Sequence, residues 1–267
     1  MTKMTQLVTM SVDDRICTLS LNRPEVMNAL NHKVFGELQA CIEKVADAGS
    51  DIGCVILKGE GRAFSSGHDL RDIEEGLEDD QSAFEAGILE ALASLPVPTI
   101  AQVHGYCFTG ALELALACDL IFIDEKTRLA DTHSKWGLSP VWGMTQRLPR
   151  RIGPARAKDL MFSSRSVEAG EALDIGLVDR VFAEGELETK TGEYAAEVAA
   201  NSSHSHRVCK QVIEATDGLR LHDGLDYEYT NSPGACHDMQ ERVAAFINRK
   251  VPSGRAWFQP SHQRSYL

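Results

Sequence analysis

The chain has 267 residues, with 27 Lys and Arg against 39 Asp and Glu, and so carries a formal net charge of −12 at pH 7. Hydrophobic residues make up 43% and charged residues 25%, the balance of an ordinary globular protein with room for one large domain. The acidic balance argues against a general binder of nucleic acid or of anionic membranes. A spanning helix is also excluded, because there is no run of about 18 apolar residues.

Two further features restrict the location and the kinds of site that we expect for this protein. The first residues lack the apolar segment of a signal peptide and the Arg-rich character of a transit peptide, so we expect a cytoplasmic protein. The seven cysteines are scattered without a Cys-x-x-Cys pair, and His204 and His206 have no third ligand nearby. We therefore expect neither a disulfide framework nor a metal site.

Strands and helices alternate through the first half of the chain. In chain order, the expected elements are a hairpin of 7–10 and 16–21, a helix over 31–48, a buried strand at 54–57, a helix over 80–95, a buried strand at 99–103, a helix over 110–117 and a strand at 120–123. This order indicates an α/β layer fold. After about residue 143 strands nearly vanish, and helical patterns recur at 154–163, 167–174, 187–200, 205–217 and 234–248.

Two glycine loops follow buried strands, over residues 59–67 and 104–110. Each would carry free backbone N–H groups to the carboxyl edge of the sheet, where α/β proteins bind ligands. Gly110 should begin a helix, so its N–H is unpaired and the helix dipole adds positive potential. One N–H from each loop would form a two-donor site for a developing oxyanion. Glu113 lies on the same helix face, in an otherwise apolar helix, where a carboxylate needs either an ion-pair partner or a catalytic task.

At this point the sequence resembles the crotonase superfamily, the enoyl-CoA hydratase/isomerase family, over about residues 7–250. The motifs that carry the resemblance are Leu21-Asn22-Arg23-Pro24, Ala63-Phe64-Ser65-Ser66-Gly67-His68-Asp69-Leu70, Gly105 through Gly110 to Glu113-Leu114-Ala115, Thr145-Gln146-Arg147-Leu148-Pro149, and Ala169 through Val178. The resemblance implies an α/β spiral of ββα units with a helical C-terminal region. We expect an acyl-CoA-binding core at residues 1–200 and a helical region at 201–267 that takes part in assembly of a homotrimer or a dimer of trimers.

The resemblance also implies the roles of individual residues. The thioester oxygen of an acyl-CoA substrate would sit in an oxyanion hole formed by the backbone N–H groups of His68 and Gly110. Glu113 matches the first of the two hydratase glutamates. The residues implied for coenzyme A binding are Arg23, Ala63, Ser66 and Arg71. No separate cofactor is expected, because coenzyme A is part of the substrate.

The position of the second glutamate is where this sequence departs from the family pattern. Counting back from Gln146 places that position on His133, which can serve as a general acid near neutral pH. If the segment is extended, Asp131 and His133 point the same way and Asp131 favours the imidazolium form. A hydrogen-bonded structural histidine is the alternative.

The leading hypothesis is an enoyl-CoA hydratase-like lyase, a hydro-lyase of fatty acid metabolism that uses Glu113 and His133. An isomerase or a decarboxylase of malonyl-type thioesters would keep the oxyanion hole and change the reaction. A non-catalytic acyl-CoA-binding or RNA-associated protein is a third possibility. It is suggested by one basic run, Arg147, Arg150, Arg151, Arg156 and Lys158, but such a run is more often a solvated face, and we expect no nucleic-acid or membrane partner. A substrate with a hydroxylated or oxidised acyl chain is a further alternative, because Trp136 and Trp142 flank the expected acyl end of the site and could shape it.

Overall fold

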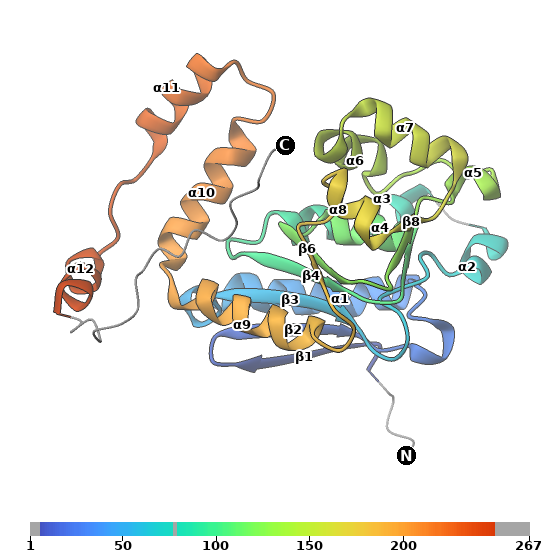
Figure 1. The fold of residues 1–267 in the computed structure, drawn as a ribbon, viewed down its shortest axis with the longest axis horizontal. Coiled ribbons are helices and arrows are strands. Elements are labelled where there is room, and N and C mark those ends of the chain that lie inside the picture. Colours follow the sequence, from blue (N-terminus) through green and yellow to red (C-terminus); the bar gives the residue numbers. More distant parts are fainter. Residues whose placement is uncertain (1–5, 77–78, 249–267) are drawn as a thin grey trace, which may run out of the picture.

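The computed structural model describes residues 6–76 and 79–248, and they fold around two sheets (Figure 1). The larger sheet has six strands in the order β1-β2-β3-β4-β6-β9. Only the β1–β2 pair is antiparallel, and every other neighbouring pair is parallel. The strands of this sheet are β1 Val8–Asp13, β2 Ile16–Leu21, β3 Cys54–Gly59, β4 Thr99–Val103, β6 Leu120–Asp124 and β9 Arg180–Phe182.

Helices cover both faces of the larger sheet. Alternate strand residues point to opposite faces, so Val55 and Leu57 join the main core while Cys54 and Ile56 join a smaller one under helix α9. This two-sided burial explains the continuous apolar run of β3. The helices that precede the C-terminal region are α1 His32–Asp47, α2 Leu70–Glu75, α3 Asp79–Ala93, α4 Gly110–Leu116, α5 His133–Trp136, α6 Met144–Ile152, α7 Pro154–Ser163, α8 Ala169–Asp174 and α9 Leu187–Ala200.

The smaller sheet positions the residues that matter for function. Its strands are β5 Tyr106–Phe108, β7 Arg128–Ala130 and β8 Val167–Glu168. β5 and β7 run parallel, and Phe108 pairs with Ala130 at their last residues. Because both strands end at the same edge, the residues that follow them, from Thr109 and from Asp131 onward, emerge side by side.

Three helices beyond residue 200 extend away from the sheets (Figure 1). They are α10 Ser203–Ala215, α11 Leu221–Asn231 and α12 Met239–Asn248, and none has a buried residue. Large apolar side chains stand in solvent, with Ile213 72%, Leu221 80% and Tyr229 91% exposed. A helix does not gain stability from an apolar side chain that nothing covers, so the exposure of these three side chains marks a surface suited to a partner.

The expected α/β fold class is confirmed, and so are the predicted elements of the first 125 residues. The expectation for the second half was wrong in detail. Short strands form at β8 and β9, so the pattern over 167–174 begins as a strand and becomes helical only at Ala169. Helices α5, α6 and α11 lie outside every predicted range, and so do α2, β5 and β7 earlier in the chain. Residues 249–267 of the expected C-terminal region lie outside the described residues.

Within the described part of the chain, no helix is both long and apolar enough to cross a membrane. The same residues contain no cluster of three or more His, Cys, Asp or Glu side chains that could hold a metal ion. All seven cysteines are free thiols, and five of them are buried.

Candidate active site

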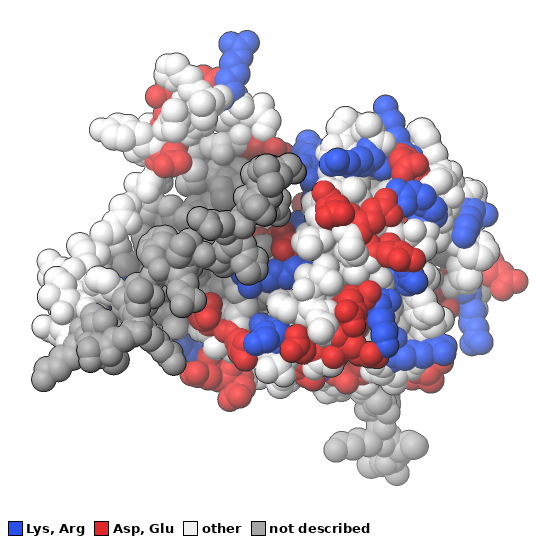
Figure 2. Space-filling model, viewed as in Figure 1, with Lys and Arg blue, Asp and Glu red and all other residues white. Residues whose placement is uncertain are grey.

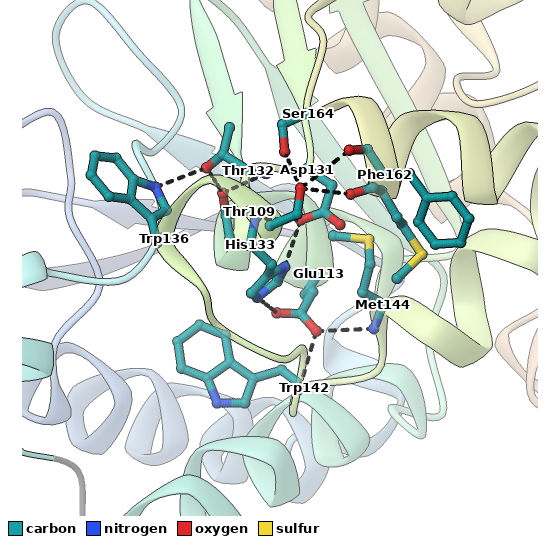
Figure 3. Close-up of polar contacts among 12 residues, drawn as sticks. Thr109, Glu113, Asp131, Thr132, His133, Trp136, Trp142, Met144, Phe162 and Ser164 are labelled. Carbon is teal, nitrogen blue, oxygen red and sulfur yellow. Dashed lines mark hydrogen bonds and ion pairs between the residues drawn. The ribbon is translucent and has the colours of Figure 1, made fainter.

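Glu113 lies near the start of α4 and is almost completely buried, with 1% of its surface exposed. Its Oε1 atom accepts hydrogen bonds from the backbone N–H groups of Trp142 at 3.1 Å and Met144 at 2.9 Å. These bonds fix the plane of the carboxyl group and leave Oε2 directed at His133 (Figure 3). Burial raises the pKa of Glu113, and the two N–H groups offset only part of this effect.

His133 stands between two buried carboxyl groups. Its Nδ1 atom lies 2.5 Å from Oδ1 of Asp131, and its Nε2 atom lies 3.7 Å from Oε2 of Glu113 (Figure 3). The backbone N–H of His133 also donates to Asp131 Oδ1 at 3.2 Å. A carboxylate beside Nδ1 favours the proton on that nitrogen, so Nε2 is the atom that faces Glu113. The three groups form a continuous line from Asp131 to Glu113.

The expected extended segment from Asp131 to His133 is not found. Strand β7 ends at Ala130, and His133 is the first residue of the short helix α5. The two side chains still meet, because the carboxylate of Asp131 accepts from the backbone N–H of His133 as well as facing its ring. A turn at a helix start therefore makes the contact that strand alternation was expected to make.

The backbone N–H groups of His68 and Gly110 lie close together beside this line. A Cβ atom placed on Gly110 would be 3.4 Å from the backbone nitrogen of His68, and one on Gly67 would be 3.5 Å from that of Gly110. Neither N–H donates to another group within the described residues. Two unpaired donors this close together are able to bind a single oxygen atom.

The conformation of Thr109 aims the Gly110 donor. Thr109 has φ +55°, a value that costs energy for a side chain with a branched Cβ. Its N–H donates to the carbonyl of Ala130 at 2.8 Å, and its hydroxyl lies 2.5 Å from that of Thr132. The strand that precedes His133 thus holds the turn that precedes Glu113.

A cavity of about 500 Å³ opens beside the two donors. This volume is typical of a small-molecule site. Its lining residues are Val26, Met27, Ala29, Ser66, His68, Asp69, Leu70, Arg71, Phe108, Thr109, Thr132, Lys135 and Trp136. Arg71 and Lys135 supply positive charge with exposed side chains in an otherwise acidic protein.

The four residues expected to bind coenzyme A occupy different positions relative to this cavity. Ser66 and Arg71 line it. Ala63 is fully buried behind it, with its carbonyl accepting from the Asn28 side chain. Arg23 forms an ion pair with Asp69 at 3.0 Å, so it stabilises the cavity wall through a residue that does line it. Contacts of these four residues with coenzyme A stay predictions.

Some residues of the site were not predicted from the sequence. Lys135 and Thr132 line the cavity, and the backbone of Trp142 and Met144 holds Glu113. Trp142 was expected to lie near the acyl end, and its buried ring packs on His68 with centroids 4.8 Å apart. No local pattern signals a backbone donor, so only the folded chain identifies it.

Most of the basic run after residue 146 is neutralised. Arg147, Arg150 and Arg151 form ion pairs with Glu90, Asp217 and Asp179, respectively, at 2.5 to 2.9 Å. Figure 2 shows acidic and basic side chains interspersed over the pictured face rather than a continuous basic surface. A cation that is already paired with a carboxylate attracts a phosphate backbone only weakly. This pairing argues against the RNA-associated alternative.

Comparisons with known proteins identify the family of the chain. The family model described as enoyl-CoA hydratase/isomerase matches residues 11–254. A Mycobacterium bovis relative, named a probable enoyl-CoA hydratase, is 35% identical over 245 residues, which cover 90% of this chain and 94% of the relative.

Solved structures show the same fold. The enoyl-CoA hydratase from Bacillus anthracis is 32% identical, with a TM-score of 0.87 over 92% of this chain and 98% of the other. A Thermobifida fusca protein solved in complex with acetoacetyl-CoA is 24% identical, with a TM-score of 0.78 over 90% of this chain and 96% of the other, a likeness that supports the fold alone. The match to the family model spans most of the sequence, and the chain belongs to the enoyl-CoA hydratase/isomerase family.

Proposed function

We propose that this protein is an enoyl-CoA hydratase that adds water to the double bond of a 2-enoyl-CoA. The observation that carries the proposal is the pair of buried acid–base groups, Glu113 and His133, 3.7 Å apart and next to two unpaired N–H donors. The Mycobacterium bovis relative, named a probable enoyl-CoA hydratase, supports a coenzyme A thioester as the ligand class.

In this proposal the thioester oxygen accepts hydrogen bonds from the N–H groups of His68 and Gly110. Removal of one such donor typically costs about 3–4 kcal/mol of barrier. The pantetheine arm lies in the 500 Å³ cavity, where Ser66 lies in the wall and Arg71 offers a cation to the phosphates. Ala63 and Arg23 contribute through the wall that they stabilise.

The chemistry needs one group that accepts a proton and one that returns it. The Glu113 carboxylate takes a proton from water as the water oxygen bonds to C3 of the substrate. The electron pair of the double bond moves toward the thioester, and the two N–H donors stabilise the resulting enolate oxygen. His133, which enters the reaction protonated on both ring nitrogens, then gives its Nε2 proton to C2, and transfer of the proton from Glu113 to Nε2 of His133 resets the pair. No further cofactor enters this sequence.

The second acid–base group distinguishes hydration from the related reactions. Isomerisation of a double bond needs one base that moves a proton, and decarboxylation needs little more than the oxyanion donors. A buried imidazole directed at Glu113 and held by Asp131 is unnecessary for either reaction. Its presence therefore favours hydration.

We also propose that the described part of the C-terminal region, residues 201–248, packs against neighbouring subunits of a trimer. The exposed apolar side chains of α10 and α11 are the support for this assembly, because they are buried nowhere in the described single chain. Whether two trimers then associate is a separate prediction, which the mass of the assembly tests.

The test is hydration of crotonyl-CoA, followed by the loss of absorbance of the conjugated thioester. Wild type should turn over, while Glu113→Gln and His133→Ala should each lose at least 100-fold in kcat. Glu43→Gln, at an exposed site outside the cavity, serves as the matched control. A wild-type protein that binds coenzyme A thioesters but hydrates none would refute the proposal and favour decarboxylation or isomerisation. If Glu113→Gln lost activity and His133→Ala did not, His133 would have a structural role rather than a catalytic one.

A further inference from the structure

A second cavity, of about 450 Å³, lies where the C-terminal helices meet the first hairpin, and we call it the arginine cavity. Three arginines from distant parts of the chain line it, namely Arg15 in the turn between β1 and β2, Arg207 in α10 and Arg242 in α12. Helix α12 returns to the start of α10 after the excursion through α11 (Figure 1). No residue lines both this cavity and the one beside the two backbone donors.

Arg15 is held in place by neutral groups. Its Nε atom donates to the carbonyl of Ser50 at 3.2 Å, and its Nη2 atom donates to the hydroxyl of Ser203 at 2.8 Å. Its Nη1 atom donates to the carbonyl of Ala199. These oxygens orient the guanidinium group but carry no charge. A positive charge is therefore fixed in the cavity wall without a carboxylate to neutralise it.

Arg207 has no polar partner at all among residues 6–76 and 79–248. Its Nε atom is buried without a hydrogen-bond partner, and its guanidinium group forms no ion pair with a described residue. A buried donor of a charged group is costly when it is left unpaired. An acceptor that enters the cavity would remove this cost.

Arg242 is the one arginine of the three that pairs with a carboxylate. Its Nε atom donates to Asp238 Oδ2 at 2.7 Å, and Asp238 is the only acidic side chain among the described residues that line the cavity. Positive charge therefore exceeds negative charge there, in a chain whose net charge is −12. His206 responds to this excess, because burial lowers its pKa and the charges of Arg15 and Arg242 lower it further.

The charge and the shape of the arginine cavity select the ligand. A guanidinium group binds carboxylates and phosphates through two parallel N–H donors. Three arginines against one carboxylate leave two positive charges, which a phosphate monoester balances and a carboxylate or a phosphodiester does not. The volume also leaves room for the organic part of an ester. Polar side chains, including Ser202, His204 and His237, favour a polar ester over a lipid.

We infer that the arginine cavity is a binding site for a polar phosphate monoester, with Arg207 as the residue whose free donors hold the phosphate. The inference does not depend on the proposed reaction, since the site lies outside the cavity assigned to the thioester. A phosphate bound by all three arginines would tie α10 and α12 to the hairpin of the larger sheet.

The experiment titrates the whole chain, in its native assembly, with inorganic phosphate and with glycerol 3-phosphate by calorimetry. At pH 8 each phosphate carries close to two negative charges. We expect one site per chain, and Arg207→Gln should weaken it by about tenfold or more, because hydrogen bonds to a charged group are lost. Arg156→Gln removes an exposed arginine of α7 outside the cavity and should bind as wild type. Acetate at the same ionic strength should bind about tenfold more weakly than phosphate or worse.

A variant with the opposite effect distinguishes loss of the site from loss of the fold. Asp238→Asn removes the only described carboxylate of the wall and keeps an acceptor for Arg242, so phosphate should bind severalfold more tightly. A misfolded variant would not gain affinity. The inference is overturned if wild type binds neither phosphate compound, if acetate binds equally well, or if a folded Asp238→Asn variant binds phosphate more weakly. Binding that survives in Arg207→Gln also overturns it, because the phosphate would then occupy another site.

Discussion

Replacement of Gly110 by alanine should inactivate the enzyme without unfolding it. The added Cβ would lie 2.3 Å from Cζ3 of Trp142, where ordinary contact between carbon atoms needs about 3.5–4.0 Å. The indole or the Gly110 backbone must therefore move by about 1.2–1.7 Å. A misplacement of about 1 Å in an active site costs about 100-fold in rate, and weakening of an oxyanion donor adds to the loss. We expect kcat to fall between about 100- and 1,000-fold, with an overpacking cost of about 1–3 kcal/mol in stability.

The assay is crotonyl-CoA hydration, together with thermal melting and calorimetric titration of coenzyme A. The affinity for coenzyme A should change little, because neither Gly110 nor Trp142 lines the cavity proposed to receive it. Gly36→Ala in α1 is the matched control, since an added Cβ there meets nothing within 4 Å and should stabilise the helix slightly. If Gly110→Ala kept more than a tenth of the wild-type kcat, the position assigned to the thioester oxygen would be wrong.

Three other predictions test the acid–base pair and the assembly. Because burial raises the pKa of Glu113 in the folded chain, the stability that this group contributes is present below the pKa of the unfolded chain and lost as pH rises through the folded value. Glu113→Gln should therefore raise the melting temperature near pH 8 and not near pH 4, and a uniform effect would contradict the assignment. Asp131→Asn should lower kcat by about 10²- to 10⁴-fold with little change in KM, because the carboxylate fixes which nitrogen of His133 faces Glu113. An unchanged kcat would show that Asp131 is not needed for catalysis. Leu221→Asp combined with Tyr229→Asp should reduce the mass measured by light scattering to that of a single chain, and an unaltered mass would place the interface elsewhere.

Local features of the site could be predicted from the sequence. Gly110 and Glu113 are three residues apart on one helix, so their relation needs only helical geometry. The pairing of Asp131 with His133 was also expected, although for the wrong local reason, since a helix start rather than a strand joins them. Short spacings carry information about contacts because few backbone conformations are available between neighbouring residues.

Contacts between distant segments could not be predicted in this way. The backbone donors of Trp142 and Met144 reach Glu113 across about thirty residues, and no periodicity signals them. Glu85 looks like one more polar residue of α3, and only the fold shows that it faces Trp142.

The missed elements have equally physical causes. Helix α6 contains Pro149, which a pattern search treats as a helix end. Helix α11 has Gly224 inside it and buries nothing, so the amphipathic signal is weak. Strands β8 and β9 have two and three residues, and so are too short to show alternation.

The parallel pairing of β5 and β7 has an evolutionary consequence. Glu113 follows one of these strands and residue 133 follows the other, and the register that aligns Phe108 with Ala130 determines how the two side chains face each other. The chain between the strands passes through α4, through β6 of the other sheet and through the turn at 125–127, in which Glu125 and Lys126 are exposed. Insertions in that turn would leave the alignment intact. A lineage can therefore exchange the side chain at position 133, and with it the chemistry, while Glu113 and the two donors keep their places.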